Sequence, residues 1–516
     1  MAPPSPPSGL RAVRLIVALV CFGSPAAAQL IPIKTIPIAQ GDQFQIFPSN
    51  NLGLGGVSIA LPDSLGDPFA NPATTARLRA SRFFASPTVY SLSGNAGGGR
   101  SLPVAMLARR ADWYGGLALV LQQVDPSRPP NQGGVVVNAP GVLTLPPPPG
   151  GVLPSPDLRA HGNEYVFGMI GRTWPAKQLS IGASALWTGL HALDGVDLLY
   201  SGSQRVVQTG HAIDVRIGAL KEWPGERGAR SLEAIVVHNR FAATHNVVYV
   251  DQFWDPGLQQ FIAQPRTDRN FDHTNTWGAQ LEYHIPLPTP GWRIGWVATV
   301  NRATHPKLPS YDLTNVAVIP WDPGRSYAYQ LGVGVSKVLG PATFGVDAIY
   351  EPIRSYTWAD AVQPTATFSG DTIAVGGKTI ENRFRFSNAV FRIGVGRDIA
   401  LEGSPNALAI QLGLMVRSIN YRLQQTDNIE VAQRALRTSW NEWTPTWGLT
   451  VRFPELELRY RGRVTKGAGR PGTQFVVGVR DMALASGTIL AVPSGPLSLV
   501  NVNTSTHQIS LSLPLH

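Results

Sequence analysis

The stretch Thr276-Trp277-Gly278-Ala279-Gln280-Leu281-Glu282-Tyr283-His284-Ile285 has an apolar residue at every second position, with a polar residue or glycine between. The connection Pro286–Gly291 follows, and the alternation restarts in Trp292–Asn301. Successive strand side chains point to opposite faces, so the two runs predict a β-hairpin with one apolar and one polar face. Soluble sheets can show the same alternation, so the recurrence of the unit decides between the fold classes.

The alternating unit recurs along most of the chain. We predict sixteen strands, with fourteen as the close alternative: Arg82–Tyr90, Ser101–Arg109, Trp113–Gln123, Glu164–Thr173, Leu179–Gly189, Ala212–Lys221, Ser231–Arg240, Thr276–Ile285, Trp292–Asn301, Tyr327–Val338, Thr343–Ile353, Ala389–Arg397, Leu408–Asn420, Trp447–Phe453, Leu456–Arg463 and Gln508–Leu515. Ten residues in a strand tilted by about 40° cover roughly 25 Å, the height of the apolar band of an outer-membrane barrel.

The connections between these strands alternate between short and long. The short ones are Arg110–Asp112, Trp174–Gln178, Glu222–Arg230, Pro286–Gly291, Leu339–Ala342, Asp398–Ala407 and Pro454-Glu455, and long connections separate them. Short periplasmic turns and long external loops are typical of outer-membrane barrels. We therefore predict an all-β, transmembrane antiparallel β-barrel. Within the long connections, Gly257–Gln264 and Ile429–Arg437 are candidates for short helices.

The N-terminus has the pattern of an export signal. Arg11 and Arg14 precede the apolar segment Leu15–Phe22, and Ala26-Ala27-Ala28 offers a cleavage site before Gln29. The apolar segment is too short to span a bilayer. The single cysteine, Cys21, lies within this signal, so no disulfide is expected in the exported chain. These features divide the chain into a signal peptide (1–28), an N-terminal segment (29–78) and a barrel (79–516).

Composition supports the membrane class. Only 15% of the residues are charged, which is low for a soluble protein of 516 residues, and the mean hydropathy is −0.01. The 53 glycines and 44 prolines favour turns and strands over long helices. The formal net charge of +10 is a mild excess for this length, and no basic run interleaved with aromatic residues occurs. Nucleic-acid binding is therefore not expected.

The segment 29–78 is not strand-like. It is rich in glycine and in Asp-Pro and Asn-Pro pairs, which favour tight turns, and we interpret it as a compact plug that precedes the first strand. Its pattern consists of Gly53, Gly55, Gly56, Ala60, Asp63, Asp67, Asn71, Pro72 and Ala73. This layout resembles the FadL-type family of bacterial outer-membrane channels for hydrophobic compounds and the related PorV-like barrels. Those proteins carry a G-x-G-G-x-x-x-A stretch, acidic residues and Asn-Pro-Ala before the first strand.

The resemblance implies location in the bacterial outer membrane, with membrane lipid around the barrel and a hydrophobic small molecule as ligand. It further implies a periplasmic plug and passive uptake driven by a concentration gradient. Two alternatives stay open, namely a PorV-like accessory barrel that binds an exported protein and a general porin for polar solutes. A water-filled lumen without a plug would favour the porin. A broad apolar loop surface would favour the partner-binding barrel.

Polar residues that alternate with the outward apolar set are predicted to line the lumen, because a charge facing lipid at mid-depth costs about 2–4 kcal/mol for Arg. They are Glu282, His284, Arg293, Asp347, Glu351, Glu457, Arg459, Arg461 and Arg463. The run from Glu457 to Arg463 places one acid and three bases on one inner face. Two interpretations apply, a stripe that attracts anions and a structural ion network, and we favour the network.

Catalysis and cofactors are not expected. No nucleophile–base spacing, metal-ligand pair or phosphate loop stands out, so the chain is predicted to be no enzyme and to hold no metal.

Pro87 and Pro103 fall within the first two strands, where proline cannot donate a ladder hydrogen bond. One interpretation is a break in the wall beside the plug, which would serve as a lateral exit for an apolar ligand. The other interpretation is a simple bulge. If the lateral exit exists, replacing both prolines should alter the uptake of an apolar ligand.

Overall fold

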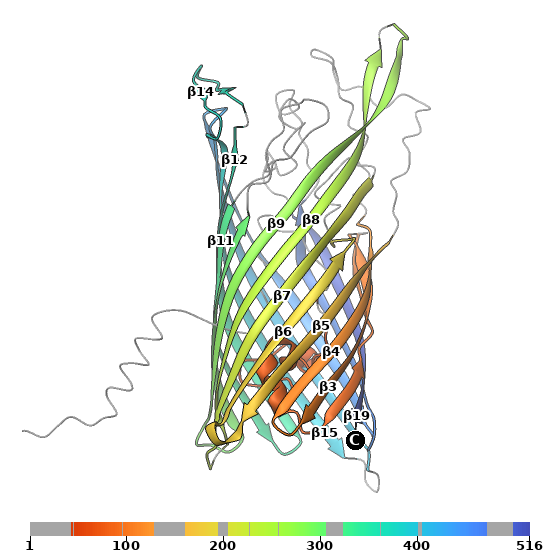
Figure 1. Cartoon of the computed structure of the whole chain (residues 1–516), viewed down its shortest axis with the longest axis vertical. Coiled ribbons are helices and arrows are strands. Elements are labelled where there is room, and N and C mark those ends of the chain that lie inside the picture. The colour runs from red at the N-terminus through yellow and green to blue at the C-terminus, as the bar shows by residue number, and fades with distance from the viewer. Residues whose placement is uncertain are drawn as a thin grey trace, which may run out of the picture.

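The computed structural model describes residues 43–44, 46–94, 96–127, 160–194, 205–226, 228–255, 257–305, 324–361, 363–400, 405–471 and 499–515. The predicted signal peptide (1–28) and residues 29–42 lie outside these ranges. Within them, no helix is both long and apolar enough to cross a bilayer. The strands wind around a barrel, and the N-terminal helices lie inside it near one end (Figure 1).

The wall is a single antiparallel sheet that closes on itself. Its strands are β1 (Ser81–Ala85), β2 (Thr88–Leu92), β3 (Gly98–Arg110), β4 (Trp113–Asp125), β5 (His161–Trp174), β6 (Leu179–Leu190), β7 (Arg205–Trp223), β8 (Arg230–Asp255), β9 (Gln260–Pro286), β10 (Trp292–His305), β11 (Gly324–Leu339), β12 (Ala342–Asp360), β15 (Lys378–Ala400), β16 (Ala407–Asp427), β17 (Ala432–Arg452), β18 (Glu457–Pro471) and β19 (Leu499–Leu515). Each of β1 and β2 pairs with β19 on one side and β3 on the other, so together they form one position in the wall. The described residues therefore form a sixteen-strand barrel, as the alternation predicted.

The predicted strands are all present, but several are longer than predicted. β8 and β9 contain 26 and 27 residues and project beyond the barrel as a paired hairpin (Figure 1). The two short helices predicted at Gly257–Gln264 and Ile429–Arg437 are wrong, because turns lead there directly into β9 and β17. Beyond the bilayer a hairpin needs no apolar outer face, so its polar strands lack the alternation on which the prediction depended.

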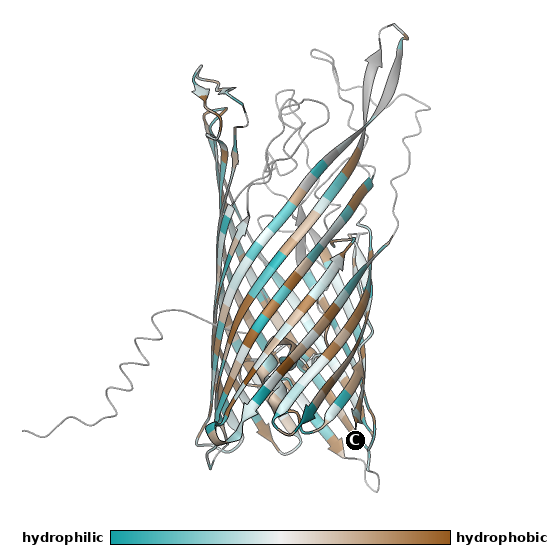
Figure 2. Ribbon diagram, viewed as in Figure 1, coloured by the Kyte–Doolittle hydropathy of each residue, from teal (hydrophilic) through white to brown (hydrophobic). Residues whose placement is uncertain are grey.

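Outward and inward faces differ as the alternation requires. Large apolar side chains are exposed on the outside, for example Leu117, Ile170, Ile217, Leu331 and Leu412. Along the strands, hydrophobic and hydrophilic residues alternate (Figure 2). At the short-turn end, Arg172 lies over the rings of Trp113 and Trp174, and Lys337 lies over Trp292. Aromatic residues beside cations are typical of the membrane interface.

The segment from residue 43 to residue 78, hereafter the inner segment, lies within the barrel (Figure 1). It contains three short helices, η1 (Asn51–Leu54), α2 (Asp67–Ala70) and η2 (Pro72–Arg77). η1 contacts β15, β16, β17 and β18, and η2 contacts β4, β5, β6 and β7. The segment therefore reaches opposite parts of the wall.

Two further short strands, β13 (Thr365–Ala366) and β14 (Thr372–Ile373), form a hairpin outside the barrel sheet.

Candidate functional site

Asp63 organises the fold of the inner segment. Its carboxylate accepts hydrogen bonds from the Ser49 hydroxyl at 2.7 Å and from the backbone N–H groups of Asn50, Leu65 and Gly66 at 2.7, 3.0 and 3.1 Å. The side chain is buried. One acidic residue thus joins the start of η1 to the start of α2, and a buried carboxylate that accepts several N–H groups is well stabilised. The motif residue Asp63 has a structural role.

Glycines in the wall make room for the inner segment. At eight inward positions, a Cβ atom would lie within 3.0 Å of the inner segment: Gly182, Gly218, Gly295, Gly332, Gly334, Gly345, Gly394 and Gly413. These positions are on seven different strands, β6, β7, β10, β11, β12, β15 and β16. The inner segment therefore approaches the wall more closely than a side chain would allow.

One half of the segment is bonded to the wall formed by β11 to β17. Asp347 on β12 accepts the backbone N–H of Ser58 at 2.8 Å, and Arg392 on β15 donates to the Gly56 carbonyl at 3.1 Å. The Gly55 N–H donates to the Thr446 hydroxyl at 2.8 Å. Gly55 and Gly56 have φ of 71° and 75°, a conformation that glycine adopts without strain. The positive φ angles, and at Gly55 the close wall backbone, explain why glycines occupy this part of the motif.

The other half is bonded to the opposite wall through Asn71 and Arg77. The Asn71 side chain donates to Glu233 on β8 at 3.0 Å, and its carbonyl oxygen caps η2 by accepting the Ala73 N–H at 3.0 Å. Arg77 pairs with Glu233 at 2.7 Å and with Glu222 on β7 at 2.9 Å. Pro72 and Ala73 pack against Gly182. Every residue of the Asn-Pro-Ala motif therefore contacts the wall.

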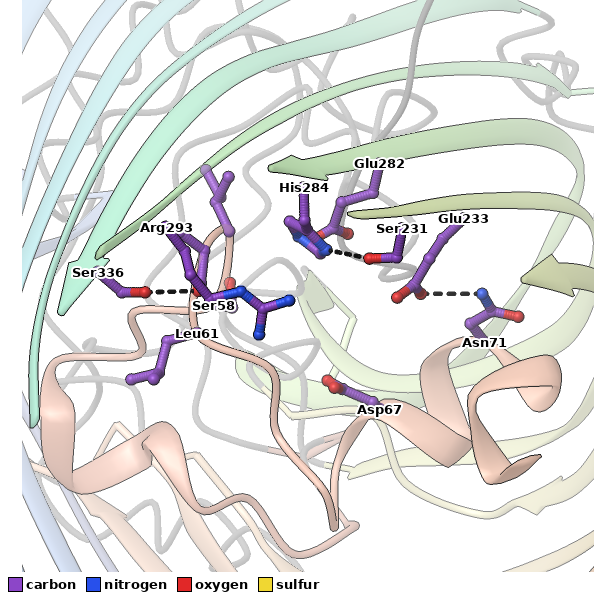
Figure 3. A network of polar contacts seen from close by, with 12 residues as sticks. Ser58, Leu61, Asp67, Asn71, Ser231, Glu233, Glu282, His284, Arg293 and Ser336 are labelled. Carbon is purple, nitrogen blue, oxygen red and sulfur yellow. Dashed lines mark hydrogen bonds and ion pairs between the residues drawn. The ribbon is translucent and has the colours of Figure 1, made fainter. Parts of the chain in front are cut away.

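Asp67 lies in the centre of this polar region, with Glu233, Asn71 and Arg293 nearby (Figure 3). It accepts the backbone N–H of Asp63 at 2.7 Å. Burial raises the pKa of the Asp67 carboxyl well above its usual range, and the negative charges of Asp63, Glu233 and Glu282 raise it further, while Arg77 lowers it. A carboxyl in this setting resists ionisation.

Because the pKa of Asp67 is raised, we expect the seating of the inner segment to depend on pH. Seating is most favourable below the usual pKa of Asp, about 3.9, and weakens as pH rises towards the raised value. We expect Asp67→Asn, which keeps the acceptor oxygen, to remove this dependence. Limited proteolysis of the inner segment between acidic and neutral pH measures it. If the digestion rate of the wild type changes with pH no more than that of the variant, Asp67 is not the source of the pH dependence.

The predicted lumen residues form separate ion pairs around the wall. His284 lies 2.8 Å from Glu282 and 3.1 Å from the Ser231 hydroxyl (Figure 3), and Glu351 pairs with Arg417 at 3.2 Å. Arg392 lies 3.9 Å from Asp347. Arg293 donates to the carbonyl of Ala229 at 3.5 Å. The described contacts of these residues are therefore local pairs, and the ion network that we favoured from sequence stays a prediction.

The run from Glu457 to Arg463 is bonded within the wall. Glu457 pairs with Arg459 at 2.6 Å, and Arg461 donates to the Leu449 carbonyl at 3.0 Å and to the Thr450 hydroxyl at 2.9 Å. Arg459 and Arg461 are buried, and Arg463 is half-buried. These contacts are those of a structural cluster, and the choice between it and an anion-attracting stripe stays a prediction.

Pro87 and Pro103 lie at one interruption of the wall. Ser86 and Pro87 separate β1 from β2, whereas Pro103 lies within β3. The register with β3 and β19 is the same on both sides of the interruption. Backbone bonds cross it, from Ser86 N–H to the Pro103 carbonyl at 3.0 Å and from Ile509 N–H to the Pro87 carbonyl at 3.0 Å. The wall is interrupted there but hydrogen-bonded, and the lateral exit stays a prediction.

Two inward surfaces are apolar, which the simple alternation missed. The first lies on β1, β3, β4 and β5, where Phe84, Leu107 and Phe167 pack with Phe69 of the inner segment. Phe69 stacks on Phe47 with ring centroids 3.9 Å apart. The second, hereafter the aromatic cluster, consists of Ala328, Ile353, Phe384, Phe386, Ile419, Tyr421, Leu423 and Trp440. A signal was present in Arg383-Phe384-Arg385-Phe386, where aromatic residues occupy the inward positions and arginines the outward ones.

The aromatic cluster lies nearer the long-loop end than the inner segment does. Along β12 the inward residues run from Asp347, which holds the segment, through Glu351 to Ile353 in the cluster. The lumen along this wall thus passes from an apolar layer through the Glu351–Arg417 pair to the inner segment. Within the part of the chain that the structure describes, no group of three or more His, Cys, Asp or Glu side chains is placed to hold a metal ion.

No protein-family model matches the sequence, and no curated protein matches it. Solved structures similar in fold include a FadL homologue from Pseudomonas aeruginosa, with 12% identity over 91% of this chain and 98% of that one and a TM-score of 0.44. The Ralstonia pickettii toluene transporter TbuX is similar with 12% identity, the same coverage and a TM-score of 0.37. The monoaromatic hydrocarbon channel CymD has 11% identity, the same coverage and a TM-score of 0.34.

Proposed function

We propose that this chain is an outer-membrane channel of the FadL type, through which hydrophobic or amphipathic small molecules pass without an energy source. Residues 29–78 would act as its plug. The observation that carries the proposal is the seating of the inner segment, which is bonded to opposite walls within the lumen. A barrel of 16–18 strands leaves an aqueous channel unless something fills it. A bonded segment in that space fits a gated channel better than a general porin.

The aromatic cluster supports an apolar ligand. Small-molecule sites are mostly apolar, with a few polar groups that fix orientation. Here the apolar layer adjoins the Glu351–Arg417 pair, so an amphipathic molecule could place its tail against the cluster and its polar end at the pair. The PorV-like alternative would need a broad apolar loop surface, and a porin would need a polar lumen. The inward aromatic residues favour the first function over the porin.

We expect the double variant Phe386→Ser with Tyr421→Ser to bind an apolar probe about tenfold more weakly or worse, because each buried apolar side chain contributes about 1.5–3 kcal/mol. The measurement is the fluorescence of N-phenyl-1-naphthylamine titrated into nanodiscs that contain the protein. Tyr350→Ser is the matched control, since Tyr350 is an exposed, outward aromatic residue on the same wall. Equal binding by wild type and double variant would reject the aromatic cluster as the site.

A further inference from the structure

A row of arginines crosses the outer surface of the barrel. Arg354 on β12 is the direct partner of Arg385 on β15, Arg385 of Arg422 on β16, and Arg422 of Arg437 on β17. We call these four residues the arginine row. Neighbouring residues show that the row faces outward, because Phe384, Phe386, Tyr421 and Leu423 between or beside its members are buried in the lumen. Neighbouring strands are about 4.8 Å apart, so four cations lie side by side over roughly 15 Å.

The arginine row has no acidic partner among the described residues. None of its four side chains makes an ion pair or a hydrogen bond with another described side chain, and the Nε atom of Arg422 is shielded from solvent without a partner. Glu381, further along β15, is already 3.4 Å from Lys378. Like charges directly opposite each other destabilise a sheet. Four arginines directly opposite one another in succession therefore indicate that an anion from outside the chain offsets the repulsion between their charges.

The position of the row along the strands places it above the apolar band. Its members lie twelve to fifteen residues from the short-turn ends of their strands, which are Ala342, Ala400, Ala407 and Arg452. Even twelve residues in a strand tilted by about 40° reach roughly 30 Å, more than the 25 Å of the band. Small polar residues separate the row from the outward apolar residues, with Ser387 on β15, Asn420 on β16 and Ser439 on β17. The row therefore lies at the height of lipid headgroups on the long-loop side.

The side chains suit phosphate in particular. Guanidinium groups bind phosphate through two parallel N–H bonds, which a lysine cannot do. Aromatic residues adjoin the row as they do at membrane interfaces, with Tyr327 directly opposite Arg354 and Arg383 over the ring of Tyr356 at 5.7 Å. Because several arginines adjoin one another, a headgroup with more than one phosphate can contact them together.

From this geometry we infer that the arginine row binds a membrane lipid whose headgroup carries more than one phosphate, in the leaflet at the long-loop end. The lipid lies flat against the wall of β12 to β17, with its acyl chains on the apolar band and its phosphates on the row. The site is outside the lumen and does not depend on what the channel conducts.

The test uses lipid A, a glucosamine disaccharide with two phosphates, labelled with a fluorophore and titrated into phosphatidylcholine nanodiscs that hold the full chain. Each arginine near an anionic lipid surface contributes about fivefold in affinity. The triple variant Arg354→Gln, Arg385→Gln, Arg422→Gln should therefore raise the apparent Kd about a hundredfold. The control variant Arg172→Gln, Lys337→Gln, Arg397→Gln removes three outward cations from the short-turn side and should retain the wild-type Kd. An unchanged Kd in the triple variant overturns the proposal.

A second measurement needs only the wild-type protein, in case the triple variant does not fold. Lipid A freed of both phosphates should bind at least tenfold more weakly than intact lipid A. Inorganic pyrophosphate should compete poorly, because it lacks acyl chains to lie on the apolar band. Equal binding of the dephosphorylated lipid overturns the role of phosphate. Full competition by pyrophosphate would show a free-anion site and overturn the lipid as occupant.

Discussion

Deleting residues 29–78 should change a closed barrel into an open one. The inner segment is seated in the lumen on eight wall glycines and is bonded to both sides of the barrel. A barrel of sixteen strands without it has room for an aqueous channel. In planar bilayers we expect low conductance from the chain that begins at Gln29 and conductance higher by an order of magnitude or more after the deletion.

Two controls separate this result from damage to the barrel. Circular dichroism and resistance to unfolding in detergent should show that the deleted protein keeps its sheet. Full-length Asp67→Asn should stay closed, because the substitution keeps the segment and its acceptor oxygen. Large, steady conductance from the intact chain would refute the plug and make a general porin the better interpretation. A deleted protein that stays closed would show that other parts of the chain block the lumen.

Much of the fold could be predicted because lipid imposes a strict rule. Residues such as Trp277, Leu281 and Trp296 face outward, where a polar side chain in contact with lipid would cost free energy. The two-residue period of the strands is therefore visible in the sequence. Outside the bilayer this rule ends, and the extensions of β8 and β9 were therefore mistaken for loops. The short turns were predictable because proline and glycine end strands at fixed places, as in Pro286–Gly291.

The site was harder to predict than the wall. The Gly53–Ala73 pattern indicated a compact segment, but nothing in it indicated that Asn71 bonds to Glu233, which is 162 positions away. Likewise, the opposition of Arg354, Arg385, Arg422 and Arg437 depends on strand register across three pairings. Register is set by turn geometry and by the burial of one face, neither of which a linear sequence displays directly. Local motifs could thus be recognised, whereas partners that are distant in sequence could not.

Glu233→Ala should release the half of the inner segment that lies against β6, β7 and β8. Glu233 accepts from Asn71 at 3.0 Å and pairs with Arg77 at 2.7 Å, and only 8% of its side chain is exposed. Its loss leaves the Asn71 amide and the Arg77 guanidinium short of a partner in a buried place. Removing one member of such a pair costs about 3–5 kcal/mol when both are fully buried. Because Arg77 is 27% exposed and keeps Glu222, we expect about 2 kcal/mol here.

That loss should appear as gating rather than as unfolding of the barrel. About 2 kcal/mol changes the ratio of seated to unseated segment roughly thirtyfold, so conductance bursts and cleavage of the segment by protease should both become frequent. Glu222→Ala is the matched control, since Glu222 pairs with the same arginine but is 41% exposed and, among the described contacts, does not bond to Asn71. We expect Glu222→Ala to have a much smaller effect. If the two variants gate alike, the contact between Asn71 and Glu233 is not what holds the segment in place. The motif would then have to be explained by its packing on Gly182 and Gly218 alone.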